Sequence, residues 1–136
     1  MVREIIHDPM FLSRKSADAT VDDMQTAQDL LDTLAANAER CVGMAANMIG
    51  IAKRIIAVND NGKYTIMFNP EIISKFGEFE TEEGCLSLEG ERKTVRYKTV
   101  KVKYLNENFK PIKRSFSDFT AQIIQHEIDH CNGILI

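Results

Sequence analysis

The chain has 136 residues, of which 44% are hydrophobic, and its formal net charge at pH 7 is -3. This length and composition suit one core, so we expect a single domain over residues 1–136. The small negative charge gives no general binding surface for nucleic acid or for an anionic membrane, and we expect neither as a partner.

The sequence also predicts a cytoplasmic protein. The N-terminal residues lack the apolar core of a secretory signal, and no stretch approaches the ~18 apolar residues of a transmembrane helix. Three cysteines (Cys41, Cys85 and Cys131) are too few for a disulfide framework, so we expect reduced thiols or a metal thiolate. For the basic run 91–104, a strand with a solvated Lys/Arg face is favoured over a docking patch for an acidic partner.

The first predicted element is an amphipathic helix over residues 21–39. Thr20 and Asp23 form a plausible capping box at its start. Apolar residues then recur at helical spacing, namely Met24, Ala27, Leu30, Leu31, Leu34 and Ala38. The glycine-containing segment 41–50 that follows suits a loop whose backbone approaches another part of the molecule closely.

Strands are expected in the middle of the chain. Two β-rich runs meet at Asn61-Gly62, which is a strong signal for a hairpin. More short strands are expected beyond it, with alternation around Val100, Val102 and Tyr104 and a turn at residues 106–108.

The last predicted helix covers residues 119–131, with Ser117 as a candidate N-cap and Gly133 as a natural stop. At about 100° per residue, its side chains fall into two stripes on opposite sides. One stripe contains Phe119, Ile123, His126 and His130, and the other contains Ile124, Ile128 and Cys131. A helix that is apolar on two opposed faces lies inside a fold, so we expect both histidines to point into the protein.

The stretch QHEIDH, residues 125–130, places two histidines one helical turn apart. Their imidazoles can converge on one metal ion, and Glu127 lies about 60° around the helix from His130. A metal lowers the pKa of water and a nearby carboxylate takes the proton, so the pattern suits hydrolysis. The same spacing occurs in ordinary helices, which leaves a structural helix open. Asp129 fits a partner of a ligand histidine and a surface or capping residue equally well.

A third protein ligand must come from elsewhere, because only CNGILI follows His130. Cys131 belongs to the opposite stripe and is expected in the core, and a structural role is favoured for His7. Cys85 is the better candidate, since the adjacent Gly84 allows a tight approach of the backbone. One cysteine and two histidines leave a coordination position open for water, as a catalytic site requires. A buried structural cysteine is the alternative.

Three motifs, VGMAAN (42–47), EGCLS (83–87) and QHEIDH (125–130), occur in an order that resembles the peptide deformylases. The resemblance spans nearly the whole chain. It implies an α+β fold in which antiparallel strands surround a central helix bearing HExxH. It also implies a hydrolase that removes the N-formyl group from the initiator methionine of newly synthesised proteins, with nascent peptides as substrates and a transient association with the ribosome.

Carried over by motif, the resemblance implies that Cys85, His126 and His130 bind a metal. In the family this metal is typically ferrous iron, with zinc or nickel as substitutes. Glu127 would be the general base and later the proton donor to the departing amine. The backbone N–H of Leu86 would help to hold the formyl oxygen as it gains negative charge.

The first motif departs from the family pattern Gly-x-Gly-apolar-Ala-Ala-x-Gln. Gly43 keeps the second glycine, but Cys41 replaces the first and Met48 replaces the glutamine. In the family, that glutamine donates a hydrogen bond to the formyl oxygen, which a thioether cannot do. Loss of one such donor costs about 2.7–4 kcal/mol, so we expect reduced activity. Asn47 is a poor substitute, because neighbouring residues on an extended loop point to opposite sides.

For the methionine side chain of the substrate, candidate pocket walls are Met44, Ile124 and Ile128, although core packing explains these residues at least as well. Family members commonly continue past the point where this chain stops, which would leave less to flank the cleft. The main alternative to an active enzyme is a homologue that binds metal and formyl-methionyl or methionyl peptide ends without efficient turnover. A purely structural metal site is a further alternative.

Overall fold

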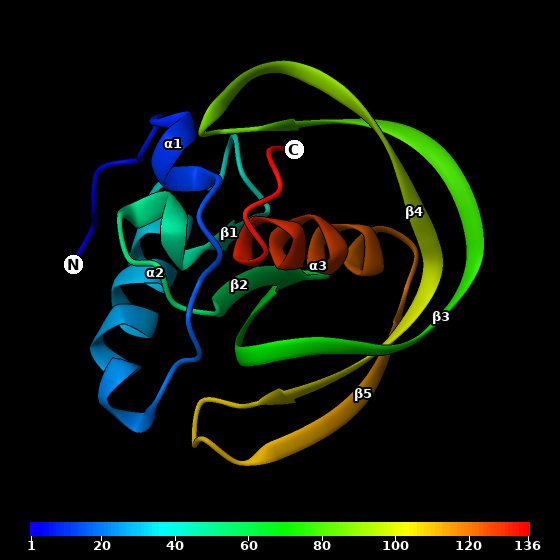
Figure 1. The fold of residues 1–136 in the computed structure, drawn as a ribbon. Helices are drawn as coiled ribbons and strands as arrows, with labels where there is room; N and C mark the ends of the chain where they lie inside the picture. Colours follow the sequence, from blue (N-terminus) through cyan, green and yellow to red (C-terminus); the bar gives the residue numbers. More distant parts are fainter.

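The computed structural model describes residues 1–136 and contains one five-stranded antiparallel sheet in the order β1-β2-β3-β4-β5. Its strands are β1 (Gly43–Ala45), β2 (Ile55–Asp60), β3 (Lys63–Cys85), β4 (Leu88–Leu105) and β5 (Pro111–Ser117). The helices are α1 (Pro9–Leu12), α2 (Met24–Ala36) and α3 (Asp118–Cys131), with 3₁₀ turns η1 (Val21–Asp23) and η2 (Ala46–Ile49). In Figure 1 the β3–β4 ribbon arches around α3, while α2 lies beyond β1 and β2. The antiparallel sheet with helices agrees with the expected α+β class.

The strands β3 and β4 are much longer than the short strands expected from the sequence, with 23 and 18 residues. Their pairing shifts register between Phe68 and Glu71 and again between Ile72 and Ser74. Such bulges bend and twist a pair of strands, which lets the ribbon continue around α3 without breaking. Each bulge also interrupts the alternation of side chains, so the sequence pattern suggests several strands where there is one.

Both predicted turns are confirmed. Asn61 and Gly62 join β2 to β3 with φ angles of 53° and 96°, and two positive φ values in succession are what a type I′ hairpin turn requires. Between β4 and β5, the side-chain oxygen of Asn106 accepts hydrogen bonds from the backbone N–H groups of Asn108 and Lys110. The sequence therefore located the hairpin ends correctly, although it did not give the strand lengths between them.

The two predicted helices differ from expectation only at their ends, whereas the short helix α1 and the 3₁₀ turn η2 were not predicted. The capping box of Thr20 and Asp23 is present, but the first residues form the 3₁₀ turn η1 and the α-helix itself covers 24–36 rather than 21–39. Helix α3 begins one residue earlier than predicted. Ser117 precedes it without a side-chain capping bond, because its hydroxyl lies 3.3 Å from the hydroxyl of Thr99 instead. Gly133 follows the helix with a φ of 76°, which agrees with its predicted role as a stop.

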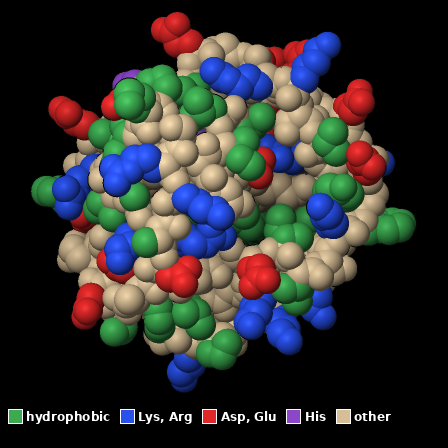
Figure 2. Space-filling view, in the orientation of Figure 1, with side chains coloured by type: hydrophobic (Ala, Val, Ile, Leu, Met, Phe, Trp, Pro, Cys, Tyr) green, Lys and Arg blue, Asp and Glu red, His purple; other side chains and the backbone are tan.

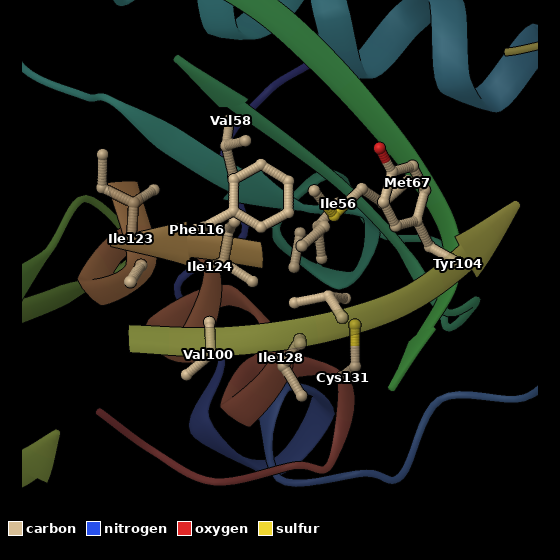
Figure 3. Packing of buried hydrophobic residues seen from close by; sticks show 13 residues of the cluster. Ile56, Val58, Met67, Val100, Tyr104, Phe116, Ile123, Ile124, Ile128 and Cys131 are labelled. Carbon is tan, nitrogen blue, oxygen red and sulfur yellow. The ribbon is translucent and has the colours of Figure 1, made fainter. Parts of the chain in front are cut away.

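The hydrophobic core consists of two clusters on opposite sides of β2. Ile56 and Val58 pack with α3 and the long strands, whereas Ile55 and Ala57 pack with α2. Figure 3 shows the first cluster, in which Phe116 of β5 lies close to side chains from β2 and α3. Because β2 is buried on both faces, the sheet separates the two helices and holds α3 inside the curve of β3 and β4.

The outer surface carries charges of both signs, which are interspersed on the face drawn in Figure 2. In the basic run of β4, Lys101 and Lys103 are exposed and alternate with the buried Val100 and Val102. This is the strand with a solvated basic face that the sequence predicts. None of the helices combines the length and apolar character needed to cross a membrane.

Candidate metal centre and active site

Both histidines of α3 lie inside the protein, as the two-stripe pattern predicts. His126 is 7% exposed and His130 is fully buried. Their Nε2 atoms are 3.1 Å apart, so one turn of helix brings the two rings to a common point. The opposite stripe of α3, including Ile124 and Cys131, belongs to the core cluster shown in Figure 3.

Cys85, the last residue of β3, reaches the same point from the other side. Its Sγ lies 3.3 Å from Nε2 of His130, and one ligand atom each from Cys85, His126 and His130 lie within 4.8 Å of one another. One sulfur and two imidazole nitrogens in this arrangement fit a tetrahedral metal with one position left for water or substrate. Burial lowers the pKa of His130 to about 3, and the charge on His126 acts in the same direction. His130 is therefore neutral, as a ligand must be.

A buried carboxylate that sequence reasoning gave no role, Glu83, orients His126. Nδ1 of His126 donates to Oε1 of Glu83 at 2.8 Å, so Nε2 faces the site. Although burial lowers the pKa of His126, hydrogen bonds with Cys85 and Glu83 raise it to about 10, so Nε2 must release a proton when it binds a metal. Arg96 holds this carboxylate at 2.7 Å and also donates to Asp129 at 2.7 Å. Burial alone would raise the pKa of Glu83, but its hydrogen bonds with His126 and Arg96 lower it to about 2. The carboxylate of Asp129 thus accepts a hydrogen bond from Arg96, and from neither histidine.

Glu127 lies beside these residues with its carboxylate buried. It is 4% exposed, and its Oε1 has no hydrogen-bond partner in the protein. Burial raises the pKa of Glu127 to about 7. A carboxyl group with a pKa near neutrality suits a group that must both take up and release a proton.

Gly43 allows β1 to lie against Glu127. A Cβ added at Gly43 would be 2.5 Å from the Cγ2 of Ile123, which is closer than real side chains approach, and 3.0 Å from Oε2 of Glu127, which is a tight contact. The second glycine of the first motif is therefore needed for contact between β1 and α3.

A cavity of about 250 Å³ opens beside Glu127 and His126. One wall is formed by residues of α3, and the other by the end of β3, by Cys85 and Leu86, and by residues 40–43 with Met48. The α3 wall comprises Phe119, Gln122, Ile123, His126 and Glu127. The cavity thus gives access to the cluster of possible metal ligands from outside.

The three residues named from the sequence as pocket walls lie elsewhere. Met44 and Ile124 are fully buried and Ile128 is 6% exposed, and all three pack in the hydrophobic clusters rather than along the cavity. The physical reason is direction, because Met44 points from β1 towards α2 and the two isoleucines occupy the core stripe of α3. Core packing is therefore their observed role.

The first-motif loop presents Met48 to the cavity, with the side chain 1% exposed. Asn47 turns the other way, and its Nδ2 donates to the backbone oxygen of His130 at 2.9 Å. It does not line the cavity, as expected for the neighbour of a cavity residue. Cys41 donates from Sγ to the oxygen of Gly43 at 2.8 Å, and burial raises its pKa to about 12. Cys41 is therefore an uncharged thiol in the cavity wall.

The sequence model of the polypeptide deformylase family matches residues 2–136. The chain belongs to the peptide deformylase family. A peptide deformylase of Clostridium beijerinckii is 53% identical over 136 residues, which covers 100% of both chains. One from Pseudothermotoga lettingae is 39% identical over 141 residues, covering 99% of this chain and 81% of the relative. The resemblance inferred from the motifs is confirmed.

Solved structures agree with this assignment. A peptide deformylase from Legionella pneumophila superposes with a TM-score of 0.89 at 36% identity, covering 99% of this chain and 83% of that one. A class I type b peptide deformylase from Acinetobacter baumannii with Met-Ala-Ser bound superposes with a TM-score of 0.88 at 30% identity. The match covers 99% of this chain and 97% of that one. The protein therefore has the peptide deformylase fold and is an enzyme of this class of hydrolases.

Proposed function

We propose that the protein is a metal-dependent deformylase that converts formyl-methionyl chain ends and water into formate and free amino termini. The observation that carries the proposal is the convergence of Cys85, His126 and His130 beside the buried Glu127. These three residues would hold ferrous iron, with zinc or nickel as substitutes. When bound, the metal polarises the formyl carbonyl and lowers the pKa of water at the site.

Three residues close to the proposed metal ligands have separate roles in the reaction. Glu127, with its raised pKa, accepts a proton from the attacking water and delivers it to the departing amine. The backbone N–H of Leu86 donates to the formyl oxygen as negative charge develops on it. Glu83 keeps the ring of His126 in the orientation that ligation requires.

The proposed substrates are nascent proteins in the cytoplasm, with a transient association with the ribosome. The Met-Ala-Ser peptide bound to the Acinetobacter baumannii relative supports a methionyl chain end as the bound group. In this chain, the methionine side chain can contact three apolar residues that line the cavity, namely Val42, Phe119 and Ile123. These residues replace the pocket walls expected from the sequence.

We also propose that deformylation is slow, because Met48 lines the cavity at the position of the family glutamine. Its thioether has no proton to donate, so one hydrogen bond to the formyl oxygen is missing. Loss of such a donor lowers the rate roughly 10²–10³-fold. The full-length match to the Clostridium beijerinckii deformylase supports slow turnover over the alternative of a binding protein without turnover.

Two variants separate a catalytic metal site from a structural one. Glu127→Ala should keep one equivalent of metal and lose formate release, since Glu127 moves protons and ligates nothing. His126→Ala should lose both, because a ligand is removed. Metal content by elemental analysis and formate release from formyl-Met peptides are the two measurements. Unchanged activity in Glu127→Ala would show that the metal site is purely structural.

A further inference from the structure

The N-terminal segment, residues 3–8, runs from α2 to the turn that follows Cys85. At its start, the backbone N–H of Arg3 donates to Oγ1 of Thr33 at 2.9 Å, and its guanidinium donates to Asp29 at 2.8 Å. Both partners are buried residues of α2. The segment is therefore fixed at one end to a helix that packs against the sheet.

Two adjacent residues of this segment bind the two loops that line the cavity. The backbone N–H of Ile6 donates to the oxygen of Met48 at 2.8 Å. The ring of His7 lies next along the chain, with Nδ1 2.9 Å from the backbone oxygen of Ser87. Because a carbonyl oxygen only accepts, Nδ1 of His7 must carry a proton and donate it. Ile6 and His7 thus fix the Met48 loop and the turn after Cys85 relative to each other.

The turn after Cys85 consists of Leu86 and Ser87 and is closed by the pairing of Cys85 with Leu88. Pairing between β3 and β4 shifts register between Gly84 and Cys85, and residues 86–87 lie outside both strands. Ser87 is 2% exposed, yet its hydroxyl has no hydrogen-bond partner in the protein. Its backbone oxygen is therefore held from the side by His7, at a point two residues beyond Cys85 and one beyond Leu86.

We propose that His7 is a positioning residue for deformylation. The proposal rests on the function proposed above, because it concerns the Leu86 N–H of that site and its neighbour Cys85. His7 holds the carbonyl of Ser87, the residue after Leu86, and so limits the movement of the turn, which keeps the Leu86 N–H directed to where the formyl oxygen becomes negatively charged. A small displacement of such a donor affects the transition state more than the bound substrate, and it lowers the rate about 10–100-fold.

Two substitutions at His7 separate the hydrogen bond from the bulk of the ring. His7→Phe keeps a ring of similar size and removes the donor. His7→Asn keeps an N–H at the same distance from the backbone as Nδ1. In the metal-loaded enzyme, we expect His7→Phe to lower kcat about 10–100-fold with KM within about twofold of wild type. His7→Asn should restore kcat to within about threefold of wild type.

Hydrogen–deuterium exchange of the metal-free protein gives a readout that does not depend on activity. Residues 84–90 should exchange faster in His7→Phe than in wild type, and at the wild-type rate in His7→Asn, with exchange in α2 unchanged. Wild-type exchange in His7→Phe, wild-type kcat in His7→Phe, or equal losses in both variants would each overturn the proposal. A wild-type protein that binds metal and releases no formate refutes the proposed function, and with it the catalytic role of His7, whatever the exchange data show.

Discussion

At the scale of single residues, Met48 is the departure from the family motif on which the proposed reduced activity rests. Its side chain lines the cavity and its Sδ accepts the backbone N–H of Ala45 at 3.5 Å. In the same conformation, the Cδ of a glutamine would occupy the place of Sδ, and its oxygen and nitrogen would lie one bond further out. Residue 48 is therefore already placed at the cavity wall, and the missing feature is a polar group that can donate.

The substitution Met48→Gln should raise kcat for formyl-Met peptides at least tenfold. The added amide would donate to the formyl oxygen in the transition state, where such a donor lowers the barrier by about 2.7–4 kcal/mol. Steady-state formate release measures the change. Met48→Leu is the control, since it keeps the volume and adds no donor, and it should leave kcat within about threefold. An equal increase in both variants would contradict the explanation.

Glu127 makes stability depend on pH in the metal-free protein. Its pKa is about 7 in the folded state, against an ordinary value of 4.5. The folded protein therefore binds this proton more tightly than the unfolded chain, and the resulting stabilisation is present below pH 4.5 and lost as the pH rises to 7. At about 1.4 kcal/mol per pKa unit, the contribution of Glu127 to the free energy of unfolding falls by about 2–3 kcal/mol between pH 5 and pH 8.

Glu127→Gln removes this titration. Urea unfolding of chelator-treated protein should show the difference in unfolding free energy, variant minus wild type, increasing by about 2–3 kcal/mol from pH 5 to pH 8. Groups far from Glu127 titrate alike in both proteins and cancel, whereas His126, whose pKa the charge of Glu127 helps to raise, changes with it. A difference that stays constant with pH would show that Glu127 titrates near its ordinary value.

Sequence reasoning found some residues of the site and missed others, for a physical reason. Helical spacing brings His126 and His130 together whatever the rest of the chain does, so their proximity could be predicted. The contact of Arg96 with Glu83 depends on the register of β3 against β4, which bulges alter. The position of Glu83 beside Cys85 in EGCLS was the one available signal for its role.

At the scale of elements, Arg96 connects three of them. It lies on β4, binds Glu83 of β3 and reaches Asp129 of α3, and it is 3% exposed. Removal of one member of a buried ion pair leaves an uncompensated charge and costs about 3–5 kcal/mol. Arg96→Leu should therefore destabilise the protein by about this amount, measured by chemical unfolding.

The chain offers a matched control in Arg114, which pairs with Asp60 at 2.8 Å but has its side chain 48% exposed. The side chain of Asp60 is 12% exposed, so only the arginine side of this pair is open to solvent. Because that side is screened by water, Arg114→Leu should cost about 1 kcal/mol, well below the effect at Arg96. Equal effects of the two substitutions would mean that the Arg96 network does not hold β3, β4 and α3 together.

The elements themselves were predictable where the signal is local. The Asn61-Gly62 turn and helix α3 depend on residues close in sequence, and both appear where expected. The lengths of β3 and β4 were not predictable, because they depend on pairing between residues far apart and on bulges that preserve it. The end of α2 at Ala36 likewise falls short of residue 39 although the residues between continue a helical pattern.

At the scale of the whole molecule, the sheet separates two hydrophobic clusters and places the candidate metal ligands at the edge of a cavity. The opposed apolar stripes of α3 predicted that this helix is enclosed, and most of its residues from Thr120 to Cys131 are buried, but Phe119 at its start is 60% exposed. The curvature of the β3–β4 ribbon around α3, seen in Figure 1, could not be read from the sequence. This curvature brings Cys85 to His126 and His130, so the geometry of the site depends on the most non-local feature of the fold.

The most direct test of the account is formate release by protein loaded anaerobically with ferrous iron and supplied with a formyl-Met peptide. We predict one equivalent of iron bound, formate and free methionyl amine released in equal amounts, and loss of both iron and activity in Cys85→Ala. The central claim would be contradicted if the wild-type protein and the Met48→Gln variant each held one equivalent of iron and neither released formate.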